Sequence, residues 1–187
     1  MNKDLNNIRI LSGNNPRDYN SNKVAVAMSG GVDSSLTAVL LKEKGFDVIG
    51  LTMLLWDYES CGGKGSETGC CDLSSIENAR RVAFEAGFPH YTVNLKKEFE
   101  NTVIYDFIKS YISGKTPNPC VVCNKEIKFG LFIKKALSLG ADFIATGHYA
   151  GKEEVKSVGS KKISYKLRQA KDNKKDQSYF LWKLNQF

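Results

Sequence analysis

The residues from Ser29 to Ser35 are of the types that bind phosphate groups. The adjacent glycines Gly30 and Gly31 allow backbone N–H groups to approach a phosphate closely, and a helix beginning here adds partial positive charge at its N-terminus. This stretch has neither the Gly-Lys-Ser/Thr ending of a Walker A loop nor the Gly-x-Gly-x-x-Gly pattern of dinucleotide folds. It therefore predicts a phosphate-binding loop of another type. The alternative is an ordinary glycine-rich turn capped by Ser or Asp.

Cysteine is the second residue type that could do chemistry. In a cytosolic chain, thiols are more often catalytic or metal-binding than paired in disulfides, and a thiolate can carry or release sulfur at neutral pH. A structural zinc site is an alternative, but adjacent Cys70 and Cys71 can hardly both bind one ion without strain. The five cysteines are Cys61, Cys70, Cys71, Cys120 and Cys123.

Most of the net charge of +7 lies in one late segment of the chain. Residues 152–175 contain nine Lys and Arg against three Asp and Glu, whereas residues 1–151 contain 17 against 16. Such a concentration of positive charge indicates a partner with a phosphate backbone, because binding releases the counterions of a nucleic acid. The alternative is a solvated, lysine-rich hairpin.

Three units of helix, glycine and strand position these residues. Each predicted helix ends at a glycine, which suits the left-handed position after a helix, and a short apolar strand follows, as in a covered parallel sheet. The predicted helices are Leu36–Lys44, Leu73–Ala86 and Ile127–Leu139. The predicted strands are Lys23–Met28, Asp47–Met53, His90–Asn94 and Phe143–Thr146. This order predicts an α/β fold with a doubly wound, mostly parallel sheet.

The remaining segments are predicted from spacing and composition. Apolar residues recur at helical spacing in Phe99–Ser113, which favours a helix with a core-facing stripe. The Pro-containing stretch Thr116–Asn124 is predicted to be a loop, and alternating basic and apolar residues after Ala150 predict a hairpin-like appendage. No apolar run approaches the roughly 20 residues that cross a bilayer, and residues 1–22 lack a secretory signal. We therefore expect a flexible N-terminal extension and a cytoplasmic protein without a membrane partner.

The phosphate loop and three later motifs resemble one family of enzymes. Ser29–Ser35 is similar to the pyrophosphate (PP) loop of N-type ATP pyrophosphatases, which cleave ATP to AMP and pyrophosphate while adenylating a substrate oxygen. Thr116–Phe129 resembles the signature of tRNA 2-thiouridylases, the MnmA family, and Thr146–Ala150 and Lys175–Leu181 match two further blocks in the same order. The resemblance covers Lys23–Leu184 and implies the adenine nucleotide alpha hydrolase-like PP-loop fold.

The resemblance also implies which residues form the site. Cys123 would be the catalytic nucleophile, with Cys120 beside the target base. ATP would be bound by Ala27, Met28, Ser29, Gly30, Gly31, Val32, Asp33, Ser34, Met53 and Gly147. The target uridine would be contacted by Asn118, Pro119 and Cys120, and the tRNA by Lys175, Asp176 and Gln177.

The reaction that the resemblance implies is the 2-thiolation of the wobble uridine, U34, in tRNA. The C2 oxygen of uridine is a poor leaving group, so ATP would convert it to an adenylate, and a persulfide sulfur would then attack C2 and expel AMP. Bound Mg²⁺ would neutralise the phosphates, and backbone donors of the loop would stabilise the developing charge. The sulfur would come from a persulfide donor protein, which can pass its outer sulfur to the Cys123 thiol, or directly from sulfide.

One departure from the family pattern concerns the cysteines. Cys120 stands where many members have Asp, so that Cys120 and Cys123 form a pair of soft ligands. Such a pair suits an iron–sulfur centre. The alternative to a persulfide on Cys123 is therefore a [4Fe–4S] cluster, with Cys70 or Cys71 as a further ligand.

The other departure concerns the extent of the chain. The partner cysteine of the family lies in a block beyond Phe187, as do a tRNA-binding domain and a β-barrel. We expect an extension at 1–22, an ATP-binding domain at 23–151, and a basic tRNA-contacting segment at 152–187 that begins a truncated tRNA-binding region. A catalytically incomplete fragment that binds tRNA or nucleotide is the other interpretation.

Overall fold

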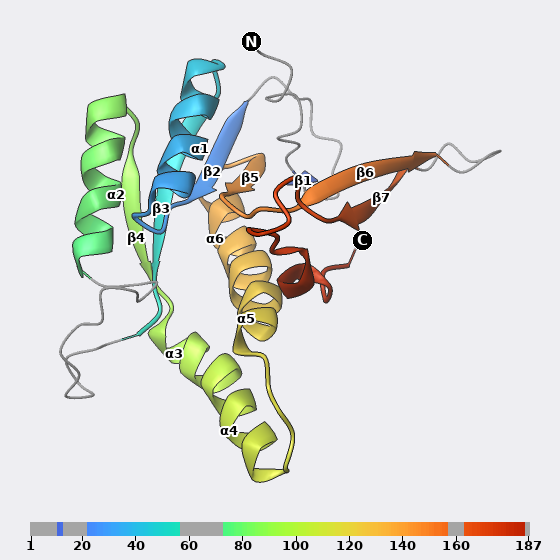
Figure 1. The fold of residues 1–187 in the computed structure, drawn as a ribbon. Helices are drawn as coiled ribbons and strands as arrows, with labels where there is room; N and C mark the ends of the chain where they lie inside the picture. The colour runs from blue at the N-terminus through green and yellow to red at the C-terminus, as the bar shows by residue number, and fades with distance from the viewer. Residues whose placement is uncertain (1–10, 13–21, 57–72, 157–162, 186–187) are drawn as a thin grey trace.

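The computed structural model describes residues 11–12, 22–56, 73–156 and 163–185, and its centre is a five-stranded sheet in the order β1-β5-β2-β3-β4 (Figure 1). Antiparallel pairing joins β1 (Leu11–Ser12) to β5 at the sheet edge. Parallel pairing joins β2 (Lys23–Ala27), β3 (Asp47–Leu54), β4 (His90–Asn94) and β5 (Phe143–Thr146). Because parallel neighbours need crossover connections, helices link these strands and cover the sheet.

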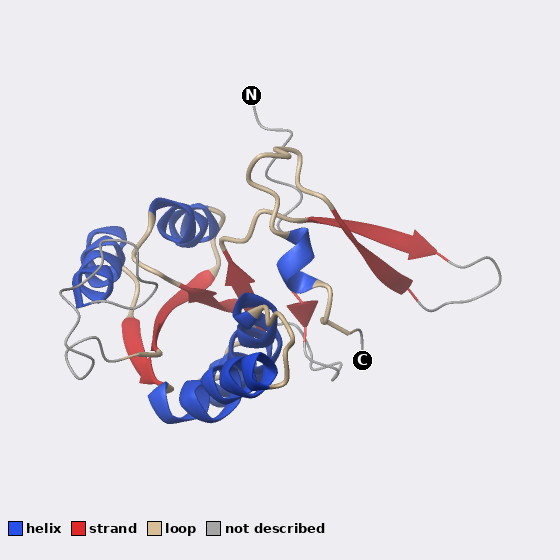
Figure 2. Cartoon of the chain, turned by 60° about the horizontal axis from the view of Figure 1, so that its bottom comes forward, coloured by secondary structure: helices blue, strands red, loops and turns tan. Residues whose placement is uncertain are grey.

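Helices lie on both faces of the sheet (Figure 2). One face is covered by α1 (Val32–Glu43) and α2 (Leu73–Ala86). The first helical rod on the other face joins α3 (Lys96–Phe99), a π-helical turn (Glu100–Ile104) and α4 (Tyr105–Ile112). The second joins α5 (Pro119–Val122), a π-helical segment (Cys123–Leu131) and α6 (Phe132–Ser138).

The two faces of β2 supply two separate cores. Val24 and Val26 pack in the cluster beneath α1 and α2, whereas Ala25 packs in the cluster with Ile127 and Phe132 of the second rod. This division follows from the alternation of side chains along a strand. The predicted doubly wound, mostly parallel α/β fold is therefore confirmed.

The glycines that were predicted to end helices do so. Gly45, Gly87 and Gly140 have φ angles of +86°, +71° and +79°, in the left-handed region where a Cβ is unfavourable. The predicted bounds of α2, β4 and β5 agree with the structure, while α1 begins at Val32, four residues before the predicted start.

The prediction of a loop at Thr116–Asn124 was wrong in its second half. A helix begins at Pro119 and continues through Cys123 to Ser138. Pro119 is in the first turn, where its missing N–H costs no hydrogen bond, and the Asn118 side chain caps the helix by accepting a hydrogen bond from the Val121 N–H at 3.3 Å. The cysteine pair therefore lies on a helix rather than on a loop.

The expected core-facing stripe of the additional helix was correct only near its start. Val103 is 1% exposed, but Ile108 and Ile112 are 51% and 82% exposed. The reason is geometric, because α4 extends beyond the carboxyl ends of the strands, where the described residues provide no sheet for it to cover (Figure 1).

The late basic segment folds as predicted into a hairpin, in which β6 (Gly151–Lys156) pairs antiparallel with β7 (Ile163–Arg168). A single-turn helix at Ser178–Leu181 follows. Within the predicted N-terminal extension, Leu11–Ser12 forms the edge strand β1, and its other residues up to 21 lie outside the described residues. In the described part of the chain, no helix combines the length and apolar character needed to cross a membrane.

Candidate functional site

The predicted phosphate loop connects β2 to α1 at the carboxyl end of the sheet. The buried hydroxyl of Ser34 shapes it by accepting a hydrogen bond from the Ser29 N–H at 3.1 Å and donating one to the Gly31 carbonyl at 3.1 Å. Gly30 has a φ of +76°, and a Cβ there would overlap the backbone of Ser75 in α2. Both the backbone conformation and the contact with α2 therefore require glycine at position 30.

Gly31 borders open space. Its φ is −84°, and the atom of the described residues that a Cβ at this position would approach is the Ser29 Oγ, at 3.6 Å. Gly31 immediately precedes α1, whose first N–H groups have no partner within the helix. Within the described residues, the loop thus leaves room for an anionic group next to backbone donors that have no partner inside the helix.

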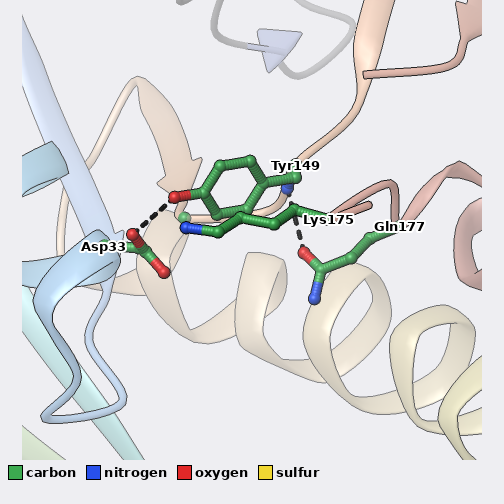
Figure 3. A pocket seen from close by; sticks show the side chains of 5 residues that line it. Asp33, Tyr149, Lys175 and Gln177 are labelled. Atoms are coloured by element: carbon green, nitrogen blue, oxygen red, sulfur yellow. Dashed lines mark hydrogen bonds between the residues drawn. The ribbon is translucent and has the colours of Figure 1, made fainter. Parts of the chain in front are cut away.

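Tyr149 connects this loop to a later part of the chain. Its hydroxyl donates a hydrogen bond of 2.6 Å to Oδ1 of Asp33 in the first turn of α1 (Figure 3). This hydrogen bond raises the pKa of Tyr149, because the carboxylate favours the protonated hydroxyl. Tyr149 therefore remains a donor at neutral pH and orients the carboxylate of Asp33.

The segment after the basic hairpin lies against Tyr149. The Gln177 N–H donates to the Tyr149 carbonyl at 2.7 Å, and the Tyr149 N–H donates to Gln177 Oε1 at 2.9 Å. Lys175 Nζ lies 5.1 Å from the centroid of the Tyr149 ring, within cation–π range. These residues, with Asp33 and Gly147, line a cavity of about 260 Å³ (Figure 3). The cavity brings two predicted ATP-binding residues together with two predicted tRNA contacts.

Gly147 allows the end of β5 to approach α1. A Cβ on Gly147 would lie 3.0 Å from the Ser34 nitrogen and 3.2 Å from the Asp33 carbonyl carbon. A second cavity of about 230 Å³ adjoins this contact, lined by Asp33, Leu36, Thr37, Leu40, Thr146, Gly147, His148 and Tyr149. The requirement for glycine at position 147 is thus explained by the close packing of two backbone segments.

The other predicted ATP-binding residues differ in exposure. Met28 and Met53 are 2% and 8% exposed, so both side chains belong to the core, whereas Val32 is 80% exposed. Ala27 ends β2 and pairs with Leu51 of β3, which places Met53 at the same carboxyl edge of the sheet as the loop. The Met28 carbonyl accepts a hydrogen bond of 2.9 Å from the Thr52 hydroxyl.

The predicted target-base residues and cysteines lie on the helix that begins at Pro119. Cys120 is exposed, whereas Cys123, one turn later, is buried. The side-chain Nδ2 of Asn124, which is 3% exposed, donates to the Phe180 carbonyl at 3.0 Å. This bond ties the cysteine-bearing helix to the segment that contains Lys175 and Gln177.

Lys175 and Gln177 line the cavity, whereas the Asp176 side chain makes hydrogen bonds within its own loop. Its Oδ1 accepts hydrogen bonds from the Ala170 N–H at 2.7 Å and the Ser178 N–H at 3.3 Å, and its Oδ2 accepts from the Ser178 hydroxyl at 2.7 Å. The bond from Ala170, followed by those from Ser178, lowers the pKa of Asp176. The carboxylate is thereby held ionised between the hairpin and the short helix at Ser178–Leu181.

His148 lines the second cavity and is partly buried. Its Nδ1 is 2.9 Å from the Thr146 hydroxyl, and its ring centroid is 5.9 Å from that of Phe129. Burial, and then the charge of Lys128, lower the pKa of His148 to about 4. The imidazole is therefore neutral at physiological pH.

The predicted iron–sulfur ligands are only partly described. Cys70 and Cys71 lie outside the described residues. Within the described ranges, no group of three or more His, Cys, Asp or Glu side chains is arranged to hold a metal ion.

Tyr149 is the residue of this site that sequence reasoning missed. It belongs to the motif Thr146–Ala150, and it follows directly after the end of β5. In parallel α/β sheets, residues in that position face the ligand-binding edge, which was the available signal.

Comparison with known families identifies the domain. Residues 22–187 match the model of the family described as the tRNA methyl transferase HUP domain. A solved structure of a predicted tRNA methyltransferase subunit from Methanocaldococcus jannaschii aligns with a TM-score of 0.41 at 24% identity, over 67% of this chain and 52% of that one. This structural similarity is too low to support a conclusion about this chain.

Curated relatives match most of the chain. The tRNA-specific 2-thiouridylase MnmA of Halothermothrix orenii is 58% identical over 166 residues, which are 88% of this chain and 44% of the relative. The MnmA of Salinibacter ruber is 52% identical over 165 residues, 88% of this chain and 42% of the relative. The chain thus spans less than half of the length of these relatives.

Proposed function

The chain belongs to the tRNA methyl transferase HUP domain family, and we propose that it uses ATP to adenylate the C2 oxygen of the wobble uridine, U34, of tRNA for 2-thiolation. The resemblance to the MnmA family is confirmed by the family match and by relatives named tRNA-specific 2-thiouridylases. One observation carries the proposal. A single cavity is lined by Asp33 and Gly147 at the phosphate loop and by Lys175 and Gln177 after the basic hairpin. A nucleotide and an RNA have to meet in such a place for this reaction.

ATP binding is supported by the loop itself. The open space at Gly31 and the first N–H groups of α1 suit a phosphate, and the exposed carboxylate of Asp33 suits Mg²⁺, which prefers oxygen ligands. Mg²⁺ bound at Asp33 would neutralise phosphate charge. Met53 and Gly147 lie at the same carboxyl edge of the sheet as the loop and would contact the nucleotide there.

The proposed reaction has two steps. The uridine C2 oxygen attacks the α-phosphorus of ATP, an oxygen–phosphorus bond forms, and pyrophosphate leaves. A sulfur nucleophile then attacks C2, the C2–oxygen bond breaks, and AMP leaves with the former uridine oxygen. Backbone N–H groups of the loop stabilise the negative charge that develops on the phosphates during the first step.

Recognition of tRNA is assigned to the basic hairpin and the segment after it. The exposed side chains of Lys166 and Arg168 on β7 suit the phosphate backbone. Asn118, Pro119 and Cys120 at the start of their helix would contact the target base. A protein with this substrate would work in the cytoplasm.

Sulfur delivery by a persulfide on Cys123 is the proposed route. Its outer sulfur attacks C2, and a second thiol then attacks the Cys123 sulfur, breaks the S–S bond and releases the 2-thiouridine with a disulfide left on Cys123. An iron–sulfur cluster that uses Cys120 is the alternative. Cys123 is 9% exposed, so a donor reaches it only if the start of its helix or a covering segment moves. Anaerobic reconstitution of the wild type, Cys120→Ala and Cys71→Ala, with absorbance and iron counting, separates the two routes. Iron retained by the wild type and lost in Cys120→Ala favours the cluster, whereas no iron in a version extended to the full length of the relatives favours the persulfide.

A second candidate function is nucleotide and tRNA binding without turnover. The observation that favours it is the burial of Cys123, which is 9% exposed and therefore poorly accessible to a sulfur donor. Adenylation and sulfur transfer can be separated experimentally, since the first needs the loop and the target base alone.

The test is the release of AMP and pyrophosphate from ATP in the presence of a persulfide donor and a thiol reductant. We expect release to require a tRNA with U34 and to fall to background when the wobble position is cytidine. Tight binding of ATP and tRNA without any tRNA-dependent release would instead establish the binding function.

A further inference from the structure

We infer that Lys175 binds the polyphosphate chain of the nucleotide, and so belongs to the ATP site as well as to the basic segment. This inference rests on the proposed nucleotide site. It assigns to Lys175 a ligand of a different class from the RNA backbone that the family resemblance implies.

The position of Lys175 carries the inference. Its side chain lines the same cavity of about 260 Å³ as Asp33 and Gly147. The ammonium end points toward Asp33 beneath the Tyr149 ring (Figure 3). Among the described lysines of residues 152–175, Lys175 alone lines this cavity. Lys175 is exposed, but its charge is directed at the phosphate loop, whereas Lys166 on β7 of the hairpin does not line the cavity.

Lys175 is also held in place. Its Nζ lies 5.1 Å from the centroid of the Tyr149 ring, and the Tyr149 backbone is fixed by two hydrogen bonds to Gln177 at 2.7 and 2.9 Å. The Tyr149 hydroxyl is bound to Asp33 at 2.6 Å. A lysine that lies over an aromatic ring loses less side-chain freedom on binding a ligand than a lysine in solvent.

The charges of the cavity fit a metal-bound polyphosphate. The carboxylate of Asp33 suits a cation, and the ammonium of Lys175 suits phosphate oxygens, for which lysine serves as a compact point charge. A nucleoside triphosphate with Mg²⁺ presents both groups, whereas AMP presents a single phosphate. The charge of Lys175 should therefore matter more for the triphosphate than for AMP.

The experiment measures nucleotide affinity of the full chain by calorimetry, without RNA. The ligands are a non-hydrolysable imido analogue of ATP with Mg²⁺, and AMP. The proteins are the wild type, Lys175→Ala, Lys175→Arg and the control Lys183→Ala. Lys183 is in the same C-terminal segment, lies over Trp182 and does not line the cavity, so its replacement removes an equal charge elsewhere.

We expect Lys175→Ala to weaken binding of the triphosphate analogue by about tenfold or more, as the loss of a charged hydrogen bond does. AMP affinity should change by less than about twofold, Lys175→Arg should retain most of the triphosphate affinity, and Lys183→Ala should match the wild type. Unchanged triphosphate affinity in Lys175→Ala, or an equal loss for AMP, would overturn the inference. The proposed nucleotide site itself fails only if the wild type binds neither ligand.

Discussion

The wild-type chain should become less stable as the pH falls from about 6.5 to about 4, because His148 takes up a proton. Replacing His148 with Gln should abolish this contribution to the pH dependence. In the folded chain, burial and then the charge of Lys128 lower the pKa of His148 from 6.5 to about 4. The unfolded chain therefore takes up a proton at a higher pH than the folded chain does. Protonation in this window favours unfolding, and the contribution of the neutral imidazole is fully present only above about pH 6.5.

The magnitude follows from the two pKa values. The fall in the pKa from 6.5 to about 4 corresponds to at most about 3 kcal/mol, reached near pH 4, and to roughly 1 kcal/mol at pH 5.5. Gln keeps a polar group near the Thr146 hydroxyl, which lies 2.9 Å from Nδ1, but it does not titrate. The variant should therefore differ from the wild type in its pH dependence more than in its stability at neutral pH.

The assay is urea unfolding at about pH 7.5 and about pH 5.5. The free energy of unfolding of the wild type should fall by roughly 1 kcal/mol more than that of His148→Gln. His90, the other histidine, also has a lowered pKa, owing to burial and then to Arg80, so the variant keeps a smaller decrease in the same direction. An equal decrease in both proteins would refute the assignment of a neutral, desolvated imidazole to His148.

Three other perturbations have separate readouts. Gly31→Val should abolish nucleotide binding without lowering the midpoint of urea unfolding. Gly30→Ala should instead destabilise the fold by at least about 1–2 kcal/mol, and similar urea midpoints for the two variants would contradict this contrast. Asn118→Ala should cost about 1 kcal/mol through loss of the helix cap, and a neutral effect would show that the cap does not stabilise the helix. Neutralising Lys166 and Arg168 should reduce the slope of log tRNA affinity against log salt by roughly 0.7–0.9 for each phosphate that the hairpin no longer neutralises; an unchanged slope would show that the hairpin does not bind the tRNA backbone.

The parts of the fold that could be predicted from sequence are those with local signals. A glycine after each helix and an apolar run after each glycine were enough to locate α2, β4 and β5. No such signal marks β1, since two residues carry no periodicity and their pairing with β5 depends on a strand far along the chain. Likewise, the stripe on α4 has helical spacing, and only the three-dimensional arrangement shows that it extends past the sheet.

The candidate site likewise has features with a local sequence signal and features that depend on contacts between distant segments. The loop at Gly30 and Gly31 was identified from its residues, but its contact with Ser75 and the bond between Tyr149 and Asp33 join segments that are distant in sequence. At Pro119, the signals for a helix start were present, namely Asn before Pro. The loop prediction rested on proline as a helix breaker, although proline is favourable in the first turn of a helix.

The most direct test of the central claim follows the C2 oxygen of the wobble uridine. A tRNA carrying oxygen-18 at that atom is incubated with the chain, ATP, Mg²⁺, a persulfide donor and a thiol reductant, and the released AMP is analysed by mass spectrometry. Adenylation of the C2 oxygen followed by attack of sulfur at C2 predicts AMP with one heavy oxygen and a thiolated tRNA without the label. Thiolated tRNA accompanied by unlabelled AMP would contradict the account, because the oxygen would then have left by a route that does not involve an adenylate.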